Sequence, residues 1–127
     1  MPTVTLLYAG LLGLLGMGLA AACGRIRGET GITLGDGDDE ALRLAMRRQS
    51  NFVEFVPLVL VLIALLEMNG VDAAAIHVLG SVFLVSRLCH ALGFTVAHPQ
   101  HLARTVGAVG SSLVLVVCSI WALVRAF

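Results

Sequence analysis

Three polar side chains share one face of a helix at the start of an apolar part of the sequence. Arg47, Asn51 and Glu54 are spaced four and then three residues apart, and side chains at this spacing lie on the same side of an α-helix. Ionisable groups are costly at membrane depth and persist there mainly where they face the interior of a bundle and meet a partner or a ligand. The stripe therefore predicts a ligand site; the alternative is that Glu54 pairs with an arginine only to hold two helices together.

A second polar pair, Arg87 and His90, is spaced three residues apart near the end of another apolar segment, so we expect the two polar faces to meet. Arg104 opens the last apolar segment on the same side of the membrane, and Arg25 or Arg27 closes the first. Guanidinium groups bind carboxylates through two parallel hydrogen bonds, which predicts an anionic ligand. Within the first stripe, the glutamate is suited to an ammonium group and the asparagine to an amide or a thiol.

Four apolar segments must position these residues. Of the 127 residues, 58% are hydrophobic and only 13% are charged, a balance that is not typical of soluble domains. Crossing a hydrocarbon core of roughly 30 Å takes about 20 apolar residues, and the stretches that meet this need are residues 2–23, 51–68, 73–94 and 104–124. We therefore expect an all-α fold, a four-helix bundle integral to the membrane, as one domain over residues 1–127. Because eight arginines balance eight acidic residues, the composition does not indicate nucleic-acid binding.

The polar, glycine-rich residues 24–38 form the longest expected connection. Asp38 or Asp39 is expected to cap the next helix, which should start in water and continue into the second span. Asn69 and Gly70, followed by Asp72, predict a tight turn before the third span.

Positive charge is distributed unevenly among these connections. The second connection carries only Asp72, whereas five arginines lie in or beside the first: Arg25, Arg27, Arg43, Arg47 and Arg48. By the positive-inside rule we expect the first loop in the cytoplasm and both termini outside.

Other residues with chemical potential are expected to be structural. His98 and His101 lie in a short polar stretch at a spacing that suits a metal poorly without further ligands, so both are expected to be solvated and no metal site is predicted. His77 is expected at the headgroup level near the outer interface. The three cysteines, scattered one per apolar segment, are expected to be small packing residues: Cys23, Cys89 and Cys118.

Two sequence motifs resemble those of a known family. Residues 47–70, RRQSNFVEFVPLVLVLIALLEMNG, resemble the Arg-x-x-x-Asn-x-x-Glu-x-x-Pro signature of the membrane-associated proteins in eicosanoid and glutathione metabolism, the MAPEG family. Residues 86–94, SRLCHALGF, are similar to its Arg-x-x-His element. The order and spacing of the four spans agree with the small bacterial members of the family over essentially the whole chain.

The resemblance implies a homotrimer in the bacterial inner membrane that binds glutathione in a cleft between neighbouring subunits. It implies a membrane-bound glutathione-dependent transferase or peroxidase that acts on lipophilic small molecules arriving from the membrane lipids. The positions matching the family's glutathione contacts are Arg47, Asn51, Glu54, Arg87 and His90, with Arg25 or Arg27 at the end of the first span. Arg104 falls near the family's thiolate-stabilising arginine, and Thr105 is a candidate hydroxyl donor to the sulfur.

The sequence also departs from the eicosanoid branch of the family. Phe94 and, by spacing, Ala108 stand where those enzymes carry tyrosines near the tripeptide, and Ser50 stands where some members have a second arginine. Fewer contacts to glutathione are therefore expected. Two other functions stay open: a glutathione-binding or lipid-binding scaffold that has lost its chemistry, and a small transporter or channel subunit whose intramembrane charges line an ion path.

Overall fold

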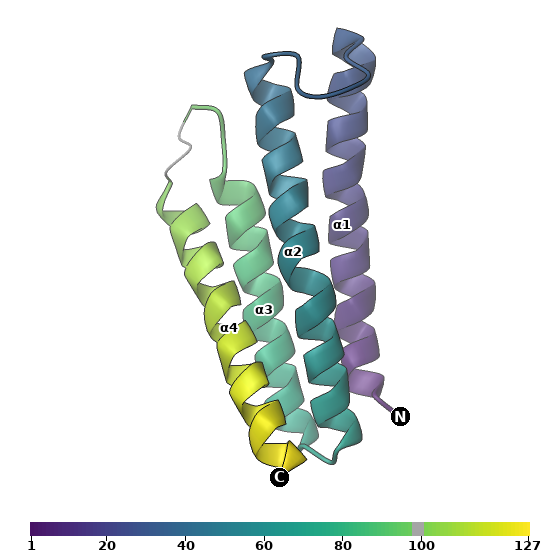
Figure 1. Ribbon diagram of the computed structural model, residues 1–127, viewed down its shortest axis with the longest axis vertical. Helices are drawn as coiled ribbons and strands as arrows, with labels where there is room; N and C mark the ends of the chain where they lie inside the picture. Colours follow the sequence, from purple (N-terminus) through teal and green to yellow (C-terminus); the bar gives the residue numbers. More distant parts are fainter. Residues whose placement is uncertain (98–100) are drawn as a thin grey trace.

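The protein is a bundle of four antiparallel helices (Figure 1). The computed structural model describes residues 1–97 and 101–127, and within these residues there is no β-strand. The helices are α1 (Thr3–Thr30), α2 (Glu40–Met68), α3 (Ala73–Gly93) and α4 (Leu102–Ala126). The α1–α2 loop and the α3–α4 connection lie at one end of the bundle, and the α2–α3 turn and both termini lie at the other (Figure 1). The prediction of an all-α four-helix bundle is confirmed, while the homotrimer remains a prediction.

All four helices are long and apolar enough to cross a membrane. Large aliphatic side chains cover the outside of the bundle, among them Leu6, Val61, Val78 and Leu123, which are each more than half exposed. Such an outer surface is unfavourable in water and suits a hydrocarbon solvent. The chain is therefore an integral membrane protein.

The first helix is longer than the sequence predicted. The loop was expected to begin at Gly24, but α1 continues to Thr30 and ends where Gly31 adopts a left-handed conformation with φ of 73°. An ion pair of 2.7 Å between Arg25 and Glu29, one helical turn apart, supports the extra turns. The connection is therefore residues 31–39 and not residues 24–38.

The second helix begins as predicted. The carboxylate of Asp39 accepts a hydrogen bond of 2.7 Å from the backbone N–H of Leu42, which satisfies one of the free donors at the helix start. The helix then runs without interruption past Pro57 to Met68. Arg47, Asn51 and Glu54 are thereby fixed on a single continuous helix.

Polar side chains cap the starts of α3 and α4. Asp72 caps α3 by accepting from the N–H of Ala74 at 2.9 Å, and Gly70 has the positive φ, 79°, of the predicted turn. The imidazole of the exposed His101 accepts from the N–H of Ala103 at 3.2 Å and so caps α4. His98 lies outside the described residues.

The core consists of aliphatic and aromatic side chains from all four helices. Leu12, Ile63, Phe83 and Cys118 are fully buried at its centre. Cys23 is also buried and Cys89 is half-buried, in keeping with the packing role expected for all three thiols. Within the described ranges α1 and α4 make no contact with each other, so they flank the α2–α3 pair (Figure 1).

At the end that carries the termini, a carboxylate from α2 caps the N-terminus of α1. Glu67 accepts from the backbone N–H groups of Val4 and Thr5, each at 2.8 Å, and from the Thr5 hydroxyl at 2.6 Å. These are donors that the first turn of a helix leaves free. At the same end the Tyr8 hydroxyl donates to the carbonyl of His77 at 3.0 Å. His77 is exposed there, as its predicted interfacial position requires.

Candidate functional site

Close contact between α3 and α4 creates the site. A Cβ added at Gly107 would overlap the backbone nitrogen of His90 and the carbonyl oxygen of Ser86, and one added at Gly110 would overlap the Ser86 hydroxyl. The two backbones therefore touch, as small residues permit at helix contacts inside membranes. This approach brings the start of α4, with Arg104, next to the end of α3.

A polar cavity of about 100 Å³ lies where α2 meets the end of α3 and the start of α4. Five of the predicted site residues line it together: Arg47, Asn51, Glu54, His90 and Arg104. Ser50 and Phe94 complete its wall. The expectation that the polar face of the second span meets that of the third is confirmed at this cavity for His90, and Arg104 joins them from the fourth span.

Phe94 forms one wall of this polar cavity and is held from two sides. The guanidinium of Arg104 lies 4.1 Å from the centre of its ring, a cation–π arrangement. Arg48 donates a hydrogen bond to the Phe94 carbonyl oxygen. The buried ring thus positions the one cation that α4 contributes to the cavity.

Arg87 does not line the polar cavity but lies behind it. Its side chain is 2% exposed, and its guanidinium stacks near the rings of Phe55 and Phe83 at 5.1 and 5.9 Å. Its Nε donates to the Ser111 hydroxyl at 2.7 Å, and one terminal nitrogen donates to the Asn51 side-chain oxygen at 2.8 Å. The structure therefore joins Arg87 to the site through Asn51, whereas its predicted contact with a ligand remains untested.

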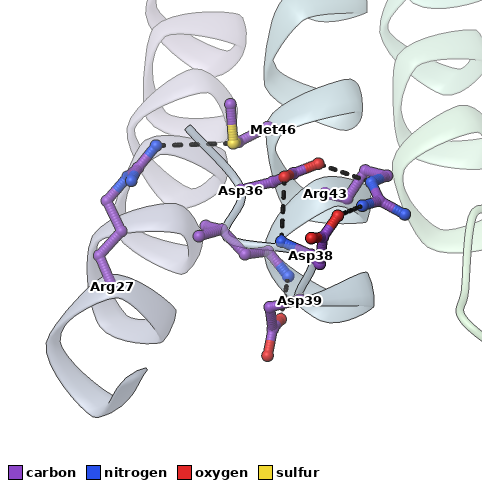
Figure 2. Close-up of polar contacts among 7 residues, drawn as sticks. Arg27, Asp36, Asp38, Asp39, Arg43 and Met46 are labelled. Carbon is purple, nitrogen blue, oxygen red and sulfur yellow. Dashed lines mark hydrogen bonds and ion pairs between the residues drawn. The ribbon is translucent and has the colours of Figure 1, made fainter. Parts of the chain in front are cut away.

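The predicted arginines of α1 lie away from the polar cavity. Arg25 is exposed and pairs with Glu29. Arg27 donates to the Ile32 carbonyl at 3.1 Å and reaches across to the sulfur of Met46 at 3.5 Å (Figure 2). Neither arginine meets the other site residues within one subunit, so their binding role remains a prediction.

An ionic contact holds the α1–α2 loop to the first turns of α2. Arg43 pairs with Asp36 at 2.6 Å and with Asp38 at 3.2 Å (Figure 2). The hydrogen bond from Arg43, helped by one from the backbone N–H of Asp38, lowers the pKa of the Asp36 carboxyl. Because the pKa is lowered, the contact is present at neutral pH and is lost only as the pH falls below the usual range of an aspartate.

Two open grooves adjoin the polar cavity and share residues with it. One, of about 340 Å³, is lined by Glu40, Arg43, Leu44, Arg47, Phe94 and Val96. The other, of about 380 Å³, is lined by Arg104, Thr105, Ala108 and Val109. Thr105 therefore lies in the second groove and not in the polar cavity, and Arg104 borders both. Ala108, a small side chain where the eicosanoid branch was noted to carry a tyrosine, lines this groove.

Two residues at the site were not predicted from the sequence to belong to it. Ser111 anchors Arg87, and Arg48 anchors the backbone at Phe94. A signal for the first was available, because Gly107, Gly110 and Ser111 form a run of small residues typical of close helix contacts in membranes. No comparable signal marks Arg48, because its partner is a backbone carbonyl.

Comparisons with known proteins agree with this architecture. The protein named Inner membrane protein YecN, from two strains of Escherichia coli, is 38% identical to this chain over 91 residues in each case, which is 72% of this chain and 70% of the relative. No solved structure matches the chain. A sequence model of the MAPEG family matches residues 5–124, which include all the residues that line the polar cavity. The chain therefore belongs to the MAPEG family.

Proposed function

We propose that the protein is a membrane-bound enzyme that uses the thiol of glutathione to attack lipophilic electrophiles. The observation that carries this proposal is the polar cavity, in which Arg47, Asn51, Glu54, His90 and Arg104 meet in a member of the MAPEG family. The name of the Escherichia coli relative further supports a place in the inner membrane.

The charges at the cavity suit a small zwitterionic peptide. Glutathione carries two carboxylates and one ammonium group, and the cavity offers guanidinium groups from Arg47 and Arg104 and a carboxylate from Glu54. A volume of about 100 Å³ admits only part of such a ligand. The adjoining grooves, reached past Arg47 and Arg104, supply the remaining space.

The chemistry proposed for Arg104 is stabilisation of the thiolate. A free thiol has a pKa of about 8.5, and only the thiolate is a strong nucleophile. A guanidinium beside the sulfur favours the charged form and so raises the thiolate fraction at neutral pH. The thiol proton goes to solvent, the sulfur forms a bond to the electrophilic carbon, and the leaving group departs with the electron pair of the bond that breaks.

The site proposed for the second substrate is the groove lined by Arg104, Thr105, Ala108 and Val109. This groove opens on the outside of α4, where aliphatic side chains face the lipid, so an apolar molecule can enter from the bilayer. That Arg104 borders both this groove and the polar cavity supports a reaction in which the sulfur and the electrophile meet beside this guanidinium.

The test is glutathione conjugation of a chromogenic aryl halide by the purified full-length protein. We expect turnover by the wild type and a loss of at least about tenfold in Arg104→Ala, because removing one charged transition-state contact costs about 1.5–3 kcal/mol. Arg125→Ala removes an exposed arginine near the C-terminus, at the other end of α4, and should retain full activity. Equal rates for the wild type and Arg104→Ala would remove Arg104 from the mechanism.

A second candidate function is glutathione binding without turnover. Two observations favour this function. Thr105, the candidate hydroxyl donor, lies outside the polar cavity, and one wall of the polar cavity is the apolar ring of Phe94. Calorimetric binding of glutathione with no conjugation of any aryl halide would select this function.

The proposed assembly is a homotrimer. Within one subunit Arg25 and Arg27 do not reach the polar cavity. An arginine of the first helix can therefore contact glutathione in this cavity only if it comes from a neighbouring subunit. A mass measurement of the protein in detergent, corrected for bound detergent, tests the trimer directly.

A further inference from the structure

Arg87 is a buried cation whose charge is not neutralised by a carboxylate. Its side chain is 2% exposed, and across residues 1–97 and 101–127 no acidic group lies within ion-pairing distance of it. Burying an uncompensated charge is costly, and in membrane proteins such groups usually serve a function. Its partners are all neutral: the Ser111 hydroxyl, the Asn51 side-chain oxygen at 2.8 Å and backbone carbonyls at 3.4 Å.

The contact between Arg87 and Asn51 fixes which way the asparagine amide points. A guanidinium has five N–H donors and no acceptor, so only the amide oxygen of Asn51 can face it. The amide NH₂ group cannot bond to Arg87 and is directed to the other side. Asn51 also lines the polar cavity, so its NH₂ group is what it offers to an occupant.

From this geometry we propose that Arg87 is a positioning residue that acts through Asn51, presenting the Asn51 NH₂ group as a hydrogen-bond donor to an acceptor atom of the bound ligand. The inference rests on the proposed function, since the ligand considered is glutathione. It also specifies the ligand chemistry, because the group that binds at Asn51 must be an acceptor such as a thiolate, a carbonyl or a carboxylate. The charge of Arg87 behind the amide favours an acceptor that carries negative charge.

The surroundings of Arg87 hold it in one orientation. Its Nε donates to the Ser111 hydroxyl at 2.7 Å, and that hydroxyl is itself fixed by donating to the Gly107 carbonyl at 2.8 Å. The guanidinium carbon lies 5.1 Å from the centre of the Phe55 ring and 5.9 Å from that of Phe83. A lysine keeps the charge but has no planar fork, so it cannot bond to Ser111 and Asn51 in the same geometry.

A double-mutant cycle on glutathione binding tests the proposal. The full-length protein is purified as wild type, Arg87→Lys, Asn51→Ala and the double variant, and the Kd for glutathione is measured by calorimetry. We expect each single variant to weaken binding by about tenfold, the size of one charge-assisted hydrogen bond. If Arg87 acts only through Asn51, the double variant should bind no more than about twofold more weakly than Asn51→Ala. If the increase in Kd of the double variant instead equals the product of the increases in the two single variants, Arg87 acts on the ligand directly and the proposal is overturned.

Two neighbouring serines provide a matched control. Ser111→Ala removes the anchor of Arg87, whereas Ser112→Ala removes an exposed hydroxyl that donates only to the Ala108 carbonyl of its own helix. We expect weaker glutathione binding for Ser111→Ala and an unchanged Kd for Ser112→Ala. Equal Kd values for the two variants would contradict an oriented Arg87.

A measurement on the wild type keeps the test decisive if Arg87→Lys does not fold. In nuclear magnetic resonance spectra, saturation with glutathione should shift the side-chain NH₂ signals of Asn51 and leave the Nε–H signal of Arg87, which is bonded to Ser111, in place. A shift of the Arg87 signal with static Asn51 signals would overturn the proposal. A wild type that binds no glutathione would instead overturn the proposed function, and this inference with it.

Discussion

At the scale of single residues, the site combines exposed charges with one buried charge. Arg47 and Glu54 are exposed on α2, so they are free to meet a ligand and contribute little to the packing of the subunit. Arg87, in contrast, is enclosed by the bundle. Substitutions at these two kinds of position should therefore have different consequences for binding and for folding.

Replacing the exposed charges should weaken binding and leave the fold intact. We expect Arg47→Ala and Glu54→Gln each to raise the Kd for glutathione by about tenfold, because each removes one charge-assisted hydrogen bond to the tripeptide. Circular dichroism should show an unchanged unfolding temperature for both. Arg125→Ala, which removes an exposed arginine at the other end of α4, is the matched control and should bind as the wild type does. Unchanged affinity in both test variants would dismiss the cavity as the binding site.

At the scale of the elements, the position of α4 against α3 depends on two glycines. Gly107 lies against the backbone at His90, and Gly110 lies against the side chain of Ser86. The same contact places Ser111 next to Arg87 and Arg104 above Phe94. Any side chain inserted between the two helices should therefore disturb both stability and the polar cavity.

Gly107→Ala should destabilise the protein and impair the site. The added Cβ meets backbone atoms that cannot move aside independently, and overpacking of this kind typically costs about 1–3 kcal/mol. Gly28→Ala is the matched control, because a Cβ at that position in α1 meets nothing within 4 Å and alanine is the better helix former. Unfolding of both variants in mixed micelles gives the difference in stability. Equal stability of the two variants would show that α3 and α4 do not need this close contact.

The elements were predictable where a single physical signal dominates. Four apolar stretches of sufficient length gave the helices, and carboxylates such as Asp39 and Asp72 marked their starts. The end of α1 was missed because the glycines and polar residues after Cys23 indicated a loop, whereas the helix continues to Thr30 with Arg25 and Glu29 paired one turn apart.

The site was predictable where one helix determines it, and less so where several do. Arg47, Asn51 and Glu54 follow directly from helical spacing. Arg87 and His90, three residues apart, differ by about 60° around the helix axis, which suffices to send one behind the cavity and the other to its wall. The separation of Arg27 from the cavity could not be foreseen, because the sequence does not say which helices are neighbours.

At the scale of the whole molecule, the two ends of the bundle differ in charge and in chemistry. The α1–α2 loop lies at one end and the termini at the other (Figure 1). The polar cavity and seven of the eight arginines lie toward the loop end, whereas the Glu67 cap and Arg125 lie at the end with the termini. Cytosolic thiols are kept reduced, so a site that uses glutathione should open toward the cytoplasm. The positive-inside rule predicts that same side for the arginine-rich end.

Cysteine labelling in membrane vesicles tests this orientation. Thr33→Cys places a thiol in the exposed α1–α2 loop, and Asn69→Cys places one in the exposed α2–α3 turn. With a membrane-impermeant maleimide we expect Thr33→Cys to react only in inverted vesicles and Asn69→Cys only in right-side-out vesicles. The wild type, whose three cysteines lie within α1, α3 and α4, gives the background. The reverse pattern would put the polar cavity on the outer side, away from the reduced thiol pool, and would thereby argue against glutathione as the substrate even if the purified protein binds it.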